Sequence, residues 1–175
     1  MRLHHLLVVV LLASASASAQ ATPTQTVLDK VLSSVNGDVI TALDVRQAKL
    51  LKLQLVVAPA QSDADVLRGL ENRRLVLAEV GHVMLTPPTA ADIDAHRRDW
   101  EATLGSGVDL PRLLDRAGLT DAGLNTWLRN DVRIGLYLAQ RFGGVPEAER
   151  PAEVERWIAT LREHAGLPKT DGKAP

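Results

Sequence analysis

Apolar residues recur every three or four positions along most of the chain from Thr41 onward, which is the spacing of one face of an α-helix. Hydroxyl residues followed three positions later by Asp begin several of these stretches, as in Ser62–Asp65 and Thr89–Asp92. Proline or glycine follows most of the stretches, as expected where helices end. Together these signals predict helices over residues 41–57, 62–84, 89–104, 109–117, 120–142 and 151–165.

The second predicted helix carries one apolar face, which includes Val66, Leu70 and Val80. Charged residues interrupt or flank that face, namely Arg68, Arg73, Arg74 and Glu79. Long charged side chains can lay their carbon stems on apolar surface while the charge stays in water. We therefore interpret these charged residues as solvated rather than functional.

A β-hairpin is predicted ahead of the helices. Asn36-Gly37 separates two β-prone runs, Val31–Val35 and Val39–Thr41, and Asn-Gly tolerates the positive φ angles of a type I′ turn. A coincidental loop is the alternative. The predicted fold class is mainly α, with a short N-terminal β-hairpin, a bundle of five to six helices and a C-terminal helix that packs back on the bundle.

The first 19 residues have the layout of a secretory signal peptide. A cationic start is followed by the apolar run Leu6–Leu12 and by small residues that offer cleavage near Ala19 or Ala21. This apolar run is much shorter than the roughly 20 residues of a membrane-spanning helix, although an uncleaved anchor is the alternative. We expect an exported protein with a mobile leader over residues 20–26 and a disordered tail over residues 168–175.

Composition and charge exclude several classes of protein. The chain has 20 Lys and Arg against 21 Asp and Glu, so it lacks the basic excess of a nucleic-acid-binding protein. It has no cysteine, which excludes disulfides, thiolate metal sites and a cysteine nucleophile. Only 3% of its residues are aromatic, so few side chains can stack on ring-shaped ligands.

The remaining residues give little sign of catalysis. Asp92, Asp94 and His96 look like a metal motif, but on a helix Asp94 points away from the other two. The other histidines outside the signal peptide, His82 and His164, have no ligand pattern around them, and the serines lack the context of a nucleophile. We therefore expect no enzyme, no metal site and no cofactor.

Four stretches resemble the N-terminal domain of SurA-type periplasmic chaperones. Asp29–Asp44 is similar to the opening strand, turn, strand and helix start of that family, and Leu70–Glu79 to the signature of its second helix. Thr86–Ile93 and Leu119–Arg129 resemble the segments that lead into its later helices. The resemblance covers residues 27–142 and implies a helical chaperone domain located in the periplasm.

The chain departs from that family in one major respect. SurA-type proteins usually carry parvulin prolyl isomerase domains after the bundle, whereas here only residues 143–150 separate it from a final helix. This helix, over residues 151–167, resembles the C-terminal helix that completes the domain in the family. A further departure is Glu71, where the family tends to have an aliphatic residue.

The resemblance implies an ATP-independent chaperone, or holdase, for unfolded secreted or outer-membrane polypeptides. Apolar grooves of a helical bundle can take up extended segments of such clients. The candidate client-binding residues are Leu50, Leu53, Met84, Trp100, Trp127 and Tyr137, and ordinary core packing is the alternative for each.

Two other functions stay open. The first is a non-enzymatic envelope adaptor that docks a specific partner, and the less favoured is a cryptic prolyl isomerase. We expect polypeptide partners, no nucleic acid, and no stable membrane span once the signal peptide is cleaved.

Overall fold

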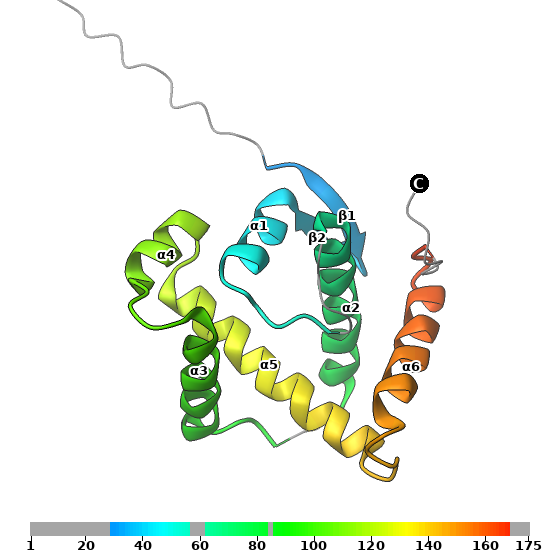
Figure 1. The fold of residues 1–175 in the computed structure, drawn as a ribbon. Coiled ribbons are helices and arrows are strands. Elements are labelled where there is room, and N and C mark those ends of the chain that lie inside the picture. Colours follow the sequence, from blue (N-terminus) through cyan, green and yellow to red (C-terminus); the bar gives the residue numbers. More distant parts are fainter. Residues whose placement is uncertain (1–28, 57–61, 84–85, 169–175) are drawn as a thin grey trace, which may run out of the picture.

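The computed structural model describes residues 29–56, 62–83 and 86–168, and it confirms a mainly helical fold with an N-terminal β-hairpin (Figure 1). The predicted signal peptide and leader, together with the tail beyond Pro168, lie outside the described residues. The elements in chain order are β1 (Val31–Val35), β2 (Asp38–Thr41), α1 (Ala42–Leu50), α2 (Asp63–His82), α3 (Ala90–Leu104), α4 (Leu110–Ala117), α5 (Asp121–Phe142) and α6 (Arg150–His164).

The hairpin forms where Asn36-Gly37 predicts it. Asn36 has φ 52° and Gly37 has φ 90°, the positive values that a type I′ turn requires. β1 and β2 pair antiparallel with Val35 opposite Asp38, and the sheet turns Val35 and Ile40 inward, where both are buried. The hairpin packs on α1 and α2 and thereby covers one end of the bundle (Figure 1).

Local capping explains why most helix starts are predictable. Thr41, Ser62 and Thr89 each accept a hydrogen bond from the backbone N–H three residues later, and the Asp at that position accepts from the cap residue's own N–H. Such capping boxes satisfy backbone donors that the helix itself leaves unpaired.

The first helix is shorter than the sequence predicts. It ends at Leu50 instead of continuing to residue 57, because Lys52 adopts a left-handed backbone conformation with φ 47°. The chain then runs without regular structure, which lets both Leu51 and Leu53 reach the core. The Trp100 indole Nε1–H donates to the Leu51 carbonyl oxygen at 2.9 Å and so satisfies a buried group outside the helix.

The buried apolar residues form two clusters that share α2 and α5. The first cluster joins the hairpin, α1, α3, α4 and the N-terminal half of α5, with Leu51, Leu124 and Leu128 fully buried. The second joins the C-terminal parts of α2 and α5 to α6 through Val76, Val80, Ile134, Tyr137 and Ile158.

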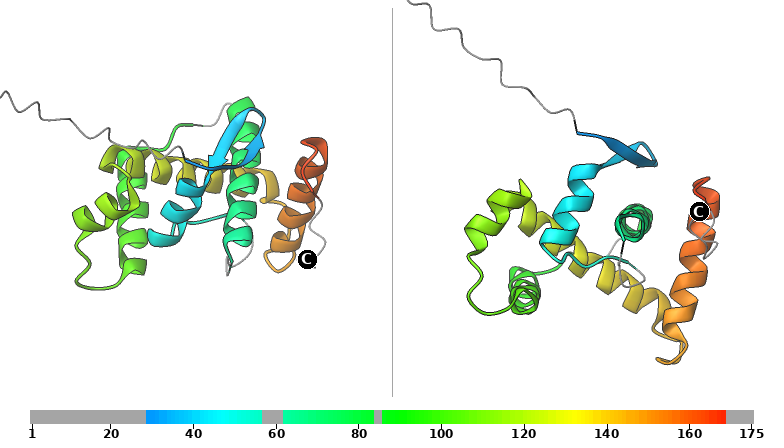
Figure 2. Two further views of the ribbon diagram at one scale, coloured as in Figure 1. Left: turned by 90° about the horizontal axis from the view of Figure 1, so that it is seen from above. Right: turned by 45° about the horizontal axis from the view of Figure 1, so that its top comes forward.

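The arrangement of the helices places α6 apart from α1, α3 and α4. α2 stands between α1 and α6, and α5 crosses the molecule beside it (Figure 2). The predicted linker is a short turn between α5 and α6, and α6 packs back on α2 and α5. No helix among the described residues combines the length and the apolar character needed to cross a bilayer.

We expect Thr89→Ala to lower the free energy of unfolding by about 1 kcal/mol, because it removes the acceptor from the start of α3. Urea denaturation followed by circular dichroism measures the change. Thr160→Ala is the matched control, since the Thr160 hydroxyl donates to the Arg156 carbonyl inside a helix and caps nothing. Equal losses in the two variants would contradict a capping role.

Candidate functional site

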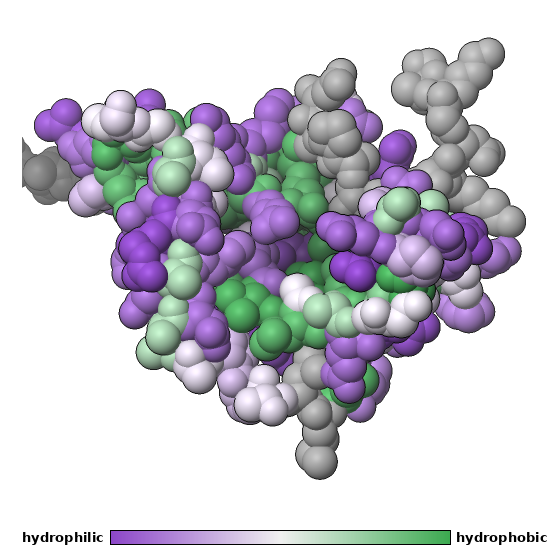
Figure 3. Space-filling model, turned by 60° about the horizontal axis from the view of Figure 1, so that its bottom comes forward, coloured by the Kyte–Doolittle hydropathy of each residue, from purple (hydrophilic) through white to green (hydrophobic). Residues whose placement is uncertain are grey.

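A cleft of about 340 Å³ lies between α2, α5, α6 and the segment that follows α1. We call it the central cleft. It is lined by Gln54, Leu55, Val56, Arg73, His96, Asp131, Ile134, Gly135, Leu138 and Val154. In the space-filling view, apolar side chains border a hollow near the middle of one face, and polar side chains lie within the hollow (Figure 3).

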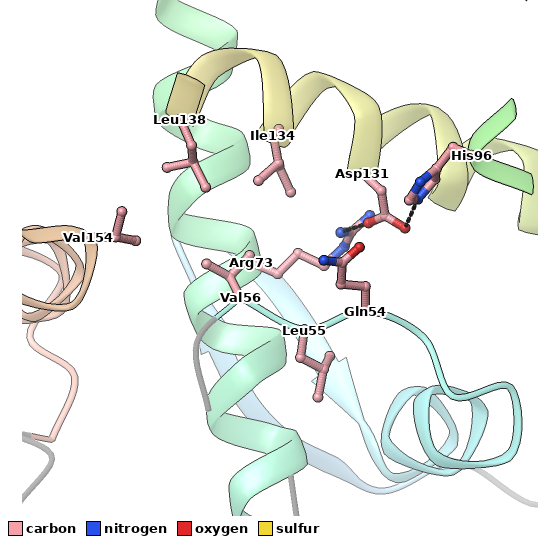
Figure 4. Close-up of a pocket in the computed structure, with 10 residues that line it drawn as sticks. Gln54, Leu55, Val56, Arg73, His96, Asp131, Ile134, Leu138 and Val154 are labelled. Carbon is pink, nitrogen blue, oxygen red and sulfur yellow. Dashed lines mark hydrogen bonds and ion pairs between the residues drawn. The ribbon is translucent and has the colours of Figure 1, made fainter. Parts of the chain in front are cut away.

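One end of the central cleft is apolar. Ile134 and Leu138 extend from α5 toward this end, and Val154 faces them from α6 (Figure 4). Gly135 of α5 also lines the cleft, and a Cβ built on it would meet no atom within 4 Å outside the neighbouring backbone of its own helix. The apolar end of the central cleft therefore has open space beside Gly135.

The other end is polar and holds a buried ion pair. The Arg73 guanidinium of α2 donates to the Asp131 carboxylate of α5, and both side chains are only 5% exposed. His96 of α3 approaches the other carboxylate oxygen, with its Nε2 3.4 Å away (Figure 4). Arg73 also donates to the Trp127 carbonyl oxygen at 3.0 Å and lies 4.0 Å from the centroid of that indole ring.

Burial sets the electrostatics of this pair. Removal from water raises the pKa of the Asp131 carboxyl, and the nearby Arg73 guanidinium and His96 only partly oppose that change. Burial likewise lowers the pKa of the Arg73 guanidinium, against the attraction of Asp131. Moving both charges out of water therefore costs a large desolvation free energy. The attraction between the two charges offsets that cost only when both partners are held in place.

The interpretation of Arg73 as a solvated residue is wrong. Its partner Asp131 lies 58 residues later in the chain, so the periodicity of α2 alone could not reveal the pair. A usable signal was present on α5, where Asp131 falls on the apolar stripe three residues after Leu128. A carboxylate on such a stripe needs a buried cation nearby.

The predicted client-binding residues do not gather at the central cleft. Leu53, Trp100 and Tyr137 are 6%, 6% and 5% exposed, so they are core residues that offer no surface to a client. Leu50 is 39% exposed on α1, but it does not line the cleft. Trp127 is half-buried beside Arg73, and Met84 lies outside the described residues.

A second buried ion pair fixes α6, the helix that carries Val154. Arg162 donates to the Glu71 carboxylate and to the Asn72 amide oxygen, each at 2.9 Å. Ser33 of β1 donates to the other Glu71 carboxylate oxygen at 2.7 Å. This pairing explains how an acidic residue is accommodated at a position where an aliphatic residue was expected.

The central cleft offers two kinds of contact to a ligand. Its lining contains no hydroxyl, thiol or amine that could act as a nucleophile, and the described residues contain no cluster of three or more His, Asp or Glu able to hold a metal ion. Its groups can make hydrogen bonds at one end and apolar contacts at the other.

Comparisons with known proteins identify no relative, because no protein-family model, no curated protein and no solved structure matches this chain. We therefore infer a function for the protein from its fold and from the residues that line the central cleft. The resemblance to SurA-type chaperones rests on the sequence motifs alone.

Proposed function

We propose that the protein is an exported, ATP-independent chaperone that holds extended segments of unfolded polypeptides in the central cleft. The observation that carries this proposal is the open cleft, in which an apolar end adjoins a polar end. The resemblance of the sequence motifs and the predicted signal peptide favour secreted or outer-membrane polypeptides as clients.

Each end of the cleft matches one component of an unfolded chain. Side chains of a client pack against Leu138 and Val154, and its peptide groups form hydrogen bonds with Gln54 and His96. Polypeptides carry these two kinds of group throughout, so such a site does not require a particular sequence.

The size of the cleft implies weak, reversible binding. Burying one large apolar side chain contributes about 1.5–3 kcal/mol, and ordering a disordered segment offsets much of that gain. A holdase that works without ATP needs clients to dissociate spontaneously, and modest affinity satisfies this need.

The alternative function of an envelope adaptor has one observation in its favour. The hairpin exposes three large apolar side chains, Val31 at 58%, Leu32 at 37% and Val39 at 50%. Neighbouring exposed apolar residues are common at protein–protein interfaces. A stable stoichiometric complex recovered through these residues would favour the adaptor, whereas weak binding of many clients favours the chaperone.

Gly135→Leu provides a direct test of the chaperone proposal. Gly135 lines the apolar end and a Cβ built on it has open space around it, so we expect a leucine there to occupy part of that end and to weaken suppression of client aggregation. The free energy of unfolding should stay equal or rise by up to about 1 kcal/mol, because leucine favours the helix more than glycine does. Light scattering by a β-barrel protein diluted from urea measures the suppression.

Gly81→Leu is the matched control for this experiment. Gly81 also lies in a helix with open space beside it, but it does not line the central cleft. We expect this variant to keep full activity. If the unchanged protein at several-fold molar excess fails to suppress aggregation, the chaperone proposal is wrong. If Gly135→Leu and Gly81→Leu suppress aggregation equally well, the central cleft is not the site where clients bind.

A further inference from the structure

A second pocket, of about 330 Å³, lies between the end of α2 and α5. Its lining includes Val80, Val83, Pro87, Arg129, Arg133 and Leu136, and we call it the arginine pocket. At 3.6 residues per turn, positions 129, 133 and 136 lie on the opposite face of α5 from positions 131, 134 and 138, which line the central cleft. The two sites are therefore separate surfaces of one helix.

The wall of the arginine pocket contains unusually exposed apolar side chains. Val83 is 39% and Leu136 is 43% exposed, whereas Val80 beneath them is buried. Together with Pro87 they form a patch that is in contact with water. Covering such a patch with an apolar side chain is favourable.

The charge in this pocket is also unbalanced. Arg129 and Arg133 lie one helical turn apart, a spacing at which like charges repel. Within the described part of the chain neither arginine forms an ion pair, and Arg133 donates only to the Asn130 amide oxygen, at 3.2 Å. Arg97 on α3 shows the contrast, since it is paired with both Glu101 and Asp121.

We propose that the arginine pocket binds the C-terminus of a polypeptide whose last residue is apolar. The carboxylate lies between Arg129 and Arg133, and the apolar side chain packs on Val83 and Leu136. A terminal residue is favoured over an internal Asp or Glu because it carries the carboxylate and an apolar side chain on the same Cα. Paired guanidinium donors are well suited to a carboxylate.

This site goes beyond the proposed holding of extended segments, since it recognises a chain end on another surface. The test uses a fluorescent Gly-Ser peptide that ends in Leu-Leu with a free carboxylate, and fluorescence anisotropy measures its binding to the full protein. We expect the same peptide with an amidated C-terminus to bind at least about tenfold more weakly, as is typical when a charged hydrogen-bonding group is removed.

Variants assign the binding to the arginine pocket. Arg129→Gln and Arg133→Gln are each expected to reduce affinity several-fold, and both keep a good helix-forming residue so that the fold is preserved. Arg98 is an exposed arginine on α3 that does not line the pocket, so we expect Arg98→Gln to bind the peptide with unchanged affinity. Gly135→Leu should also bind this peptide normally, which separates a failure here from a failure of the chaperone proposal.

Several results would overturn the inference. Equal affinity for the amidated peptide would exclude recognition of the terminal carboxylate. Equal affinity for an amidated peptide with an internal Asp-Leu would show that any acidic residue suffices. Displacement of the peptide by laurate at a lower concentration than by unlabelled peptide would identify the ligand as a fatty acid.

Discussion

Arg162→Met is expected to lower the free energy of unfolding by about 3–5 kcal/mol. The substitution leaves the Glu71 carboxylate buried in α2 without its cation, and only the Ser33 hydroxyl still donates to it. The Asn72 amide oxygen also loses its donor. An unpaired buried charge is far more costly than a lost surface contact, so the effect should dominate urea denaturation curves followed by circular dichroism.

A double variant separates the cost of an unpaired charge from the value of the helix contact. Glu71→Leu combined with Arg162→Met replaces the pair with apolar side chains and should recover most of the lost stability. Arg156→Met is the matched control on the same helix, because Arg156 pairs with Glu153 at the surface, and we expect a change within about 0.5 kcal/mol. A double variant no more stable than Arg162→Met would contradict this account.

Trp100→Ala is expected to destabilise the protein by a similar amount, about 3–5 kcal/mol. The indole is buried in the first apolar cluster, and its removal leaves a large cavity there. It also leaves the buried Leu51 carbonyl without the donor that replaces a helical hydrogen bond. Thermal or urea unfolding measures the loss.

The same position distinguishes a core residue from a client-binding residue. Trp100→Phe keeps most of the ring, so it should be less destabilising than Trp100→Ala and should still suppress aggregation of a client. Val108→Ala is the matched control, since it shortens an exposed apolar side chain in the turn before α4, and its effect on stability should be small. If Trp100→Ala retained full stability yet lost client binding, Trp100 would be part of the client surface after all.

Local signals made most of the fold predictable. A cap such as Thr89 and a turn such as Asn36-Gly37 act through neighbours within a few residues, so the sequence displays the whole interaction. The end of α1 was different. Leu51 and Leu53 fit a helical pattern equally well, and the core that draws them inward is built from distant elements, including the Trp100 ring.

The candidate site was less predictable because its key contacts join distant segments. Arg73 and Asp131 are 58 residues apart, and Glu71 and Arg162 are 91 residues apart. Trp100 and Tyr137 were wrongly predicted to bind clients for a related reason. A large ring can pack in a core or bind a client at the surface equally well. Only the packing of helices decides between the two, and it places Trp100 and Tyr137 inside.

The pairing of Ser33, Glu71 and Arg162 also connects the first strand and the last helix through α2. It joins the first strand, the second helix and the last helix, which gives the domain contacts of high sequence separation despite its helical content. A chain that ended before α6 would lack Arg162, and with it the cation that the buried Glu71 carboxylate requires. Removal of α6 would also uncover the side of α2 against which this helix packs.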